Sequence, residues 1–243
     1  MEIFNSWLVT DYISHRGLHT KELPENSLGA FQNSIINSYP IELDVQQISD
    51  GTIVVFHDAS LARMTKKDGY TKNLIKAELS EYKLSGTEYC IPTLQEVLDL
   101  VEGQVPLLIE IKNEGKVGEV EKSVWEILKN YKGEYAIQSF NPFSLEWFKK
   151  NAPHVIRGQL STFFRKENLA SFFKRFALKR MFLNKKVSCP HFISYDSRYL
   201  PNRFVKKYKN IPLIAWTIKS QSDYMKVVKY CDNIIFEGFE PKI

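Results

Sequence analysis

Short apolar runs rich in β-branched residues alternate with segments of helical periodicity along nearly the whole chain. This alternation predicts parallel strands joined by crossover helices, which is the α/β class. The predicted strands are Asp11–His15, Ile41–Val45, Leu107–Ile111, Tyr135–Phe140, Val155–Leu160, Phe192–Asp196, Leu213–Ile218 and Asn233–Glu237. Eight parallel strands are the number that closes a TIM-type (β/α)8 barrel, so we expect this fold.

The predicted helices have recognisable starting residues. Asn26 or Ser27 can cap the first of them. Thr93 and Glu96 form the pattern of a capping box for a helix over 94–101. Further helices are predicted near 117–131, 142–150 and 220–230. The chain ends soon after the eighth strand, so we expect another element to cover that part of the barrel in place of a closing helix.

One apolar run, Ile53–Phe56, does not fit the alternation, because only Asp50-Gly51 separates it from the second strand. This dipeptide favours a two-residue turn, and it predicts a β-hairpin insertion after the second strand, within residues 46–92 or so. Such a turn sets a pairing register that places His57 directly opposite Asp44. We therefore expect an imidazole beside a carboxylate.

Length and composition indicate one barrel domain over residues 1–243. Three widely spaced cysteines argue against a disulfide framework and against a zinc site, and they favour a reducing compartment. No stretch reaches the roughly 18 uninterrupted apolar residues of a transmembrane helix. We expect a cytoplasmic protein whose oligomeric state the sequence leaves open.

Paired carboxylates carry the first sign of chemistry. Glu42 and Asp44 are two residues apart on a strand, so both side chains leave the same face. Buried carboxylates repel one another and stay ionised together only beside a cation. Glu110 and Lys112 repeat the spacing on the next barrel strand and add a third carboxylate and a positive charge for a phosphate. Oxygen ligands of this kind suit one divalent ion, Ca²⁺ or Mg²⁺.

Two histidines complete the candidate site. His15 and Arg16 end the first strand, and Gly17 allows a sharp turn there. His57 ends the extra run. One imidazole can remove a proton and the other can protonate a leaving alcohol, while the metal and Arg16 neutralise phosphate oxygens. Either histidine alone is explained as well by a local hydrogen bond. Their joint occurrence with three carboxylates at strand ends favours an active site.

Several short motifs recur here in a familiar order and spacing. They are His15-Arg16-Gly17, Pro24-Glu25-Asn26-Ser27, Glu42-Leu43-Asp44, Asp50-Gly51, His57-Asp58 and Glu110-Ile111-Lys112, followed by the weaker Arg63-Met64-Thr65, Ile91-Pro92-Thr93-Leu94, Ser139-Phe140 and Trp216-Thr217. In these motifs the chain resembles the glycerophosphodiester phosphodiesterase family. The resemblance is dense to about Lys112 and sparse after it.

The resemblance implies a TIM-like barrel that hydrolyses glycerophosphodiesters to sn-glycerol 3-phosphate and an alcohol. The residues that match the family's site are Glu42, Asp44 and Glu110 for the metal, His15 and His57 for catalysis, and Arg16 and Lys112 for the phosphate. We assign His15 as the base and His57 as the acid. Glu25 is a candidate for orienting the site, and Trp216 is a candidate substrate contact.

Two other functions stay open at this point. Residues 163–186 hold eight Lys or Arg against one Glu, together with six phenylalanines. Phe163–Lys186 could dock on an anionic membrane and favour lysophospholipase D-like hydrolysis of lysophospholipids. An amphipathic helix packed on the barrel explains the same pattern. The other function is a non-catalytic module that binds metal or phosphate. No motif for reading nucleic acid accompanies the basic residues, so we expect no nucleic-acid partner.

Overall fold

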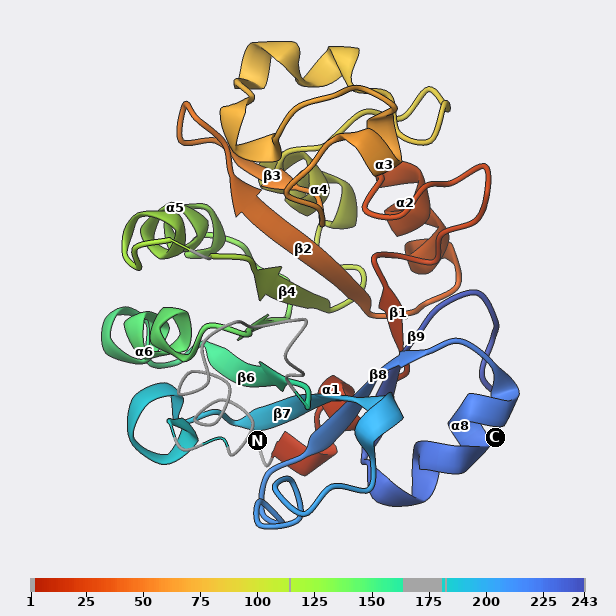
Figure 1. Ribbon diagram of the computed structural model, residues 1–243, viewed down its shortest axis with the longest axis vertical. Helices are drawn as coiled ribbons and strands as arrows, with labels where there is room; N and C mark the ends of the chain where they lie inside the picture. The colour runs from red at the N-terminus through yellow and green to blue at the C-terminus, as the bar shows by residue number, and fades with distance from the viewer. Residues whose placement is uncertain (1–2, 114, 164–180, 182, 243) are drawn as a thin grey trace. The chain divides into compact units, whose positions relative to one another are not determined.

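The computed structural model describes residues 3–113, 115–163, 181 and 183–242, and its elements follow the predicted alternation (Figure 1). The strands are β1 (Ile13–His15), β2 (Ile41–Gln47), β3 (Ile53–Val55), β4 (Leu107–Ile111), β5 (Tyr135–Ser139), β6 (Ile156–Ser161), β7 (Phe192–Asp196), β8 (Leu213–Ile218) and β9 (Asn233–Phe236). The α-helices are α1 (Trp7–Thr10), α2 (Leu28–Ile36), α3 (Ala62–Thr65), α4 (Leu94–Val101), α5 (Glu119–Leu128), α6 (Pro142–Asn151) and α8 (Gln221–Val227).

Two of the predicted helix starts are confirmed in atomic detail. The Ser27 hydroxyl accepts a hydrogen bond from the Ala30 amide and caps α2. Thr93 and Glu96 form the expected capping box at the start of α4. None of the helices in the described residues is both long enough and apolar enough to cross a membrane.

The chain divides into two compact units: a central unit, Ser14–Tyr135, and a terminal unit, Met1–Ile13 together with Ala136–Ile243. In the central unit β2 pairs in parallel with both β1 and β4, and in the terminal unit β5 to β9 are parallel neighbours in sequence order. The described residues thus form eight parallel strands that alternate with helices, and the predicted TIM-type (β/α)8 barrel is confirmed as the fold class.

The hairpin register differs from the prediction. β3 runs antiparallel to β2, but Val45 pairs with Val55, which shifts the register by one residue. The loop holds three residues, with Gly51 left-handed at φ +89°, and the Ile48 amide donates to the Thr52 carbonyl. The side chain of Asp50 stabilises this longer loop by accepting from the amides of Thr52 and Lys76.

The expectation that His57 lies directly opposite Asp44 is therefore wrong. The Phe56 amide, one residue earlier, donates to the Asp44 carbonyl, and β3 has already ended at Val55. His57 stands in the segment that follows the strand, where the side chain of Gln46 donates to the carbonyls of Phe56 and Asp58. The imidazole reaches the site from a loop that side chains of neighbouring elements hold in place.

A hydrophobic cluster of its own supports this part of the central unit. Its members are Ile48, Val54, Phe56, Leu61, Met64, Leu74, Leu79, Leu84 and Ile91. They come from the predicted insertion region, with Val54 of β3 among them, and all are buried. The loop that carries His57 is thus anchored in a hydrophobic cluster through Phe56, the residue before it.

In the terminal unit, α1 lies against β9 at the amino end of that strand. The side chain of Asn233, the first residue of β9, donates to the carbonyls of Leu8 and Asp11, which flank the end of α1. Trp7 and Leu8 are buried. The N-terminal helix therefore supplies a cover for the last strand. The segment Phe163–Lys186 falls largely outside the described residues, so both interpretations of it stay predictions.

The turn after β1 depends on Gly17, and we predict that Gly17→Ala is strongly destabilising. Its φ is +79°, and an added Cβ would lie 2.9 Å from Ala30 and from Phe31. The left-handed conformation costs a non-glycine residue roughly 1–2 kcal/mol. Overpacking against α2 adds roughly 1–3 kcal/mol. Urea denaturation gives the change in the free energy of unfolding.

Gly51→Ala is the matched control for that substitution. Gly51 has a similar φ of +89°, but the nearest atom to an added Cβ is the flexible end of Gln47, 3.9 Å away. This variant should lose only the part of the unfolding free energy that comes from the left-handed backbone conformation. Equal losses of unfolding free energy for the two variants would contradict the close packing of Gly17 on α2.

Candidate active site

Three carboxylates meet on adjacent strands of the central unit. Asp44 on β2 stands beside Glu110 on β4 in the parallel register, and Glu42 precedes Asp44 by two residues on the same face. One carboxylate oxygen from each lies within 4.8 Å of the others. All three are buried: Glu42 is 2% exposed, Asp44 is 1% exposed and Glu110 is 8% exposed. The predicted convergence of these side chains is confirmed.

The electrostatics of this cluster are those of a cation site. Burial, followed by the charges of Asp44 and Glu110, holds the pKa of Glu42 well above its ordinary value. Burial also raises the pKa of Glu110, although Lys112 opposes the effect. Asp44 differs, because the positive charges of Lys112 and Arg16 outweigh its burial and lower its pKa. Glu42 and Glu110 are therefore the carboxylates that an added positive charge would relieve most.

The donor set fits a divalent ion that prefers oxygen. Ca²⁺ and Mg²⁺ bind carboxylate oxygens at about 2.0–2.6 Å, so two ligands on opposite sides of such an ion lie roughly 4–5 Å apart. The spread of up to 4.8 Å among the three oxygens agrees with that geometry. Within the described residues these three form the one group of acidic, histidine or cysteine side chains with such a spacing.

Two cationic side chains border the carboxylates. Lys112 Nζ donates to Glu110 Oε1 at 3.1 Å and to Asp44 Oδ1 at 3.4 Å. Arg16 Nε lies 3.2 Å from Asp44 Oδ2. Both charges thus stand beside the cluster, where they can also reach an anionic ligand.

The loop after β1 holds its functional residues in a left-handed conformation. Arg16 has φ +55° and Asn26 has φ +56°, which is uncommon for residues other than glycine and typical of functional sites. The Arg16 amide donates to Glu42 Oε2, and Asn26 Nδ2 donates to Asp44 Oδ2 at 2.9 Å. Sequence reasoning left Asn26 out, because it could equally cap α2. Ser27 takes that role, which leaves the Asn26 amide to hold Asp44.

Both histidines lie beside this cluster. His15 Nε2 is 4.0 Å from Glu42 Oε2, since His15 and Glu42 are register partners on β1 and β2. The charge of His57 acts on Asp44 and Glu110 in the direction that lowers a carboxyl pKa, although burial keeps the pKa of Glu110 raised. His57 Nδ1 lies 2.7 Å from Asp58 Oδ1. The structure therefore brings the five predicted residues together within one unit.

Glu25, predicted to orient the site, joins two arginines. Its Oε1 accepts from Arg16 at 2.5 Å, and its two oxygens accept from Arg63 at 2.7 and 2.8 Å. These bonds, the one from Arg63 above all, outweigh burial and lower the pKa of Glu25 to about 2. Arg63 was missed as a site residue, although Arg63-Met64-Thr65 was among the motifs of the resemblance.

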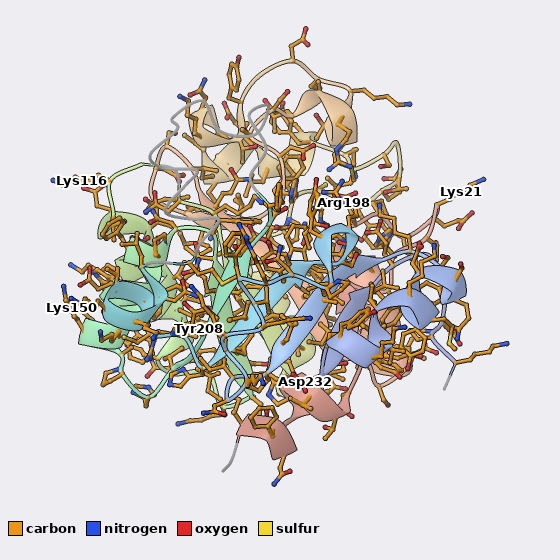
Figure 2. The ribbon with its side chains drawn as sticks, turned by 60° about the horizontal axis from the view of Figure 1, so that its bottom comes forward. Lys21, Lys116, Lys150, Arg198, Tyr208 and Asp232 are labelled. Atoms are coloured by element: carbon orange, nitrogen blue, oxygen red, sulfur yellow. The ribbon has the colours of Figure 1, made fainter. Side chains whose placement is uncertain are left out.

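Trp216 lies in β8 of the terminal unit. Its Nε1 is buried and has no hydrogen-bond partner in the part of the chain that the structure describes. With Asp196 and Arg198 it lines a cavity of about 580 Å³ at the carboxyl ends of β7 and β8. Figure 2 shows Arg198 and Asp232 at opposite ends of these strands. Trp216 thus stands at the end where barrel enzymes bind ligands, and its contact with substrate stays a prediction.

Comparison with known proteins gives concordant results. The model of the Glycerophosphoryl diester phosphodiesterase family matches residues 15–236. A glycerophosphodiester phosphodiesterase of Caldanaerobacter subterraneus subsp. tengcongensis is 35% identical over 162 residues, which are 61% of this chain and 65% of that protein. The lysophospholipase D GDPD1 of Rattus norvegicus is 34% identical over 137 residues, 51% of this chain and 42% of that protein. The match therefore spans less than two thirds of either relative.

A solved structure extends the likeness to the whole fold. The glycerophosphodiester phosphodiesterase of Thermotoga maritima aligns with a TM-score of 0.69 at 27% identity, over 93% of each chain. The family match begins at His15 and extends past Trp216, so it contains every residue predicted for the site. The chain belongs to the glycerophosphoryl diester phosphodiesterase family.

Proposed function

We propose that this protein is a metal-dependent phosphodiesterase that hydrolyses glycerophosphodiesters to sn-glycerol 3-phosphate and an alcohol. The observation that supports this most directly is the buried cluster of Glu42, Asp44 and Glu110, whose oxygens lie within 4.8 Å of one another beside two imidazoles. Family membership and the 35% identical relative support the same reaction.

The three carboxylates would hold one divalent ion, Ca²⁺ or Mg²⁺, which when bound draws negative charge from the phosphate and so favours attack at phosphorus. Arg16 and Lys112 stand beside Asp44 and would bind the remaining phosphate oxygens. The guanidinium and the ammonium thereby orient the diester in front of the histidines. A substrate anion would also offset part of the positive charge that these two side chains add.

The histidines divide the proton transfers. The attacking oxygen, from water or from the glycerol 2-hydroxyl, loses its proton to His15. The alcohol leaves with a proton from His57, whose other ring nitrogen is already engaged by Asp58. The P–O bond to the alcohol breaks as the new P–O bond forms, so charge does not accumulate on the leaving oxygen. Attack by water gives sn-glycerol 3-phosphate directly, whereas attack by the 2-hydroxyl gives a cyclic phosphate that a water molecule must then open to the same product.

The second candidate function is lysophospholipase D-like hydrolysis. The specific observation in its favour is the likeness to the rat lysophospholipase D over 51% of this chain. Both functions use the same carboxylates and histidines and differ in the alcohol or lipid that the substrate carries. Parallel turnover of glycerophosphocholine and a lysophosphatidylcholine therefore decides between them: a higher kcat/KM for the lysolipid would reverse our preference.

The assignment of His57 as the acid predicts a dependence on the leaving group. His57→Ala should lower kcat for glycerophosphocholine by about 100-fold or more. The same variant should lose much less on a glycerophosphodiester with a 4-nitrophenol leaving group, because that anion needs no proton. His15→Ala should slow both substrates alike.

Initial rates for the two histidine variants, measured with Ca²⁺, with Mg²⁺ and with a chelator, check these outcomes. Chelation should abolish turnover. An equal loss on both substrates for His57→Ala would refute its role as the acid. A wild-type protein that binds a divalent ion yet turns over no phosphodiester would be the non-catalytic module instead.

The metal site predicts an unusual effect of Glu42→Gln. The folded protein holds the pKa of Glu42 above its unfolded value, so in metal-free protein ionisation of this carboxyl opposes folding once the pH rises past about 4.3. At about pH 8 the variant should therefore be more stable than wild type without metal, by roughly 2–4 °C in Tm per kcal/mol of relief. It should also lose most of the stabilisation that Ca²⁺ or Mg²⁺ gives the wild type.

Thermal melts of both proteins, with chelator and with each ion, test this prediction. Glu81→Gln changes an exposed glutamate of the same unit and serves as the control that should leave both Tm and the metal effect unchanged. The gain from Glu42→Gln should vanish near pH 4, where the unfolded carboxyl is also protonated. A metal effect of wild-type size in this variant would exclude Glu42 as a ligand.

A further inference from the structure

A continuous chain of charged side chains runs from His57 to the loop after β1. His57 Nδ1 contacts Asp58 Oδ1 at 2.7 Å, and Arg63 Nε donates to Asp58 Oδ2 at 2.5 Å. The two terminal nitrogens of Arg63 donate to the two oxygens of Glu25. Glu25 in turn accepts from Arg16, which borders Asp44. One arginine thereby links the elements that carry the two catalytic histidines.

We propose that Asp58 and Arg63 are positioning residues: Asp58 selects the ring tautomer of His57, and Arg63 holds Asp58 in the orientation that does so. This role rests on the proposed phosphodiesterase function, in which His57 is the general acid. Neither residue is needed to contact substrate or metal. Both act through the imidazole.

The tautomer follows from the hydrogen-bonding capacity of each group. Hydrogen bonds from Arg63 and His57 outweigh the burial of Asp58 and lower its pKa, so the carboxylate is ionised and can only accept. His57 Nδ1 must therefore carry a proton. Nε2 is left as the ring nitrogen that exchanges a proton with the substrate. Two further hydrogen bonds fix the backbone of Asp58, because its carbonyl accepts from the side chains of Gln46 and Thr71.

All three nitrogens of the Arg63 guanidinium donate a hydrogen bond in this arrangement. Nε faces Asp58, while the two terminal nitrogens form a fork on Glu25. A fork of this kind adds geometric specificity that a single ammonium cannot reproduce. Arg63 is 48% exposed, so its ion pairs add little to stability. Its contribution is orientation, since it fixes which Asp58 oxygen faces the imidazole.

The decisive variant is Asp58→Asn. In the presence of Arg63, the one amide oxygen of the asparagine must face the guanidinium, which donates only. The amide nitrogen then faces His57 Nδ1 and forces the ring proton onto Nε2, so the catalytic nitrogen changes its role. Removing Arg63 as well frees the asparagine to turn its oxygen toward the ring. The double variant Asp58→Asn/Arg63→Met should therefore recover activity that Asp58→Asn alone has lost.

Kinetics on glycerophosphocholine give the first readout. We expect kcat to fall about 100-fold or more in Asp58→Asn, with little change in KM. Arg63→Met should lower kcat by roughly 10- to 100-fold, and Arg63→Lys should restore only part of it. Lys83→Met is the matched control, because Lys83 is 46% exposed and pairs with Glu88 in the same unit, and neither residue belongs to the site. This control should keep wild-type kcat.

Heteronuclear NMR of the histidine ring nitrogens gives a readout that does not depend on turnover. When the His57 ring is neutral, the wild type should carry its proton on Nδ1, Asp58→Asn on Nε2, and the double variant on Nδ1 again. A double variant no better than Asp58→Asn in kcat, or an unchanged tautomer in Asp58→Asn, would overturn the inference. A wild type without phosphodiesterase activity would refute the proposed function, while the NMR would still decide the tautomer.

Discussion

Mutual repulsion among three buried carboxylates is the constraint to which the rest of the site responds. Glu42, Asp44 and Glu110 have almost no contact with solvent, so their charges must be balanced by neighbouring groups. Lys112 and Arg16 do this for Asp44, whose pKa falls, but leave Glu42 and Glu110 with raised pKa values. A divalent cation bound among the three carboxylates would complete the balance.

The carboxylates and His15 could be predicted because parallel strands make a simple rule. Residues two apart share a face, and neighbouring strands of a barrel end on the same side, so polar residues at strand ends converge. The register His15–Glu42 and Asp44–Glu110 is what this rule requires. The positions of the strands and helices could also be predicted from the sequence, because the spacing of apolar residues depends on the local structure and on which side chains are buried.

Loop contacts could not be predicted in this way. The hairpin register differs by one residue from the predicted one, because the loop holds three residues and the Asp50 side chain stabilises it. The Asp50-Gly51 dipeptide alone does not distinguish a two-residue loop from a three-residue loop. Asn26 could equally have been a helix cap, and only its hydrogen bond to Asp44 distinguishes the two roles. Arg63 lies 38 residues from Glu25 in sequence, and nothing in the local pattern joins them.

Strand pairing and loop side-chain contacts position different residues of the site. Strands fix the carboxylates, because their backbone bonds leave little freedom at the register positions. His57 has no such support, since it follows β3 on a loop, and general acid catalysis requires its ring nitrogen within hydrogen-bond reach of the leaving oxygen. Half-exposed ion pairs such as those of Arg63 cannot add much stability, yet a guanidinium that is bonded to two carboxylates restricts the orientation of both. In the proposed mechanism an acid carried on a loop needs a contact of this type, and Asp58, which Arg63 holds, supplies one to His57.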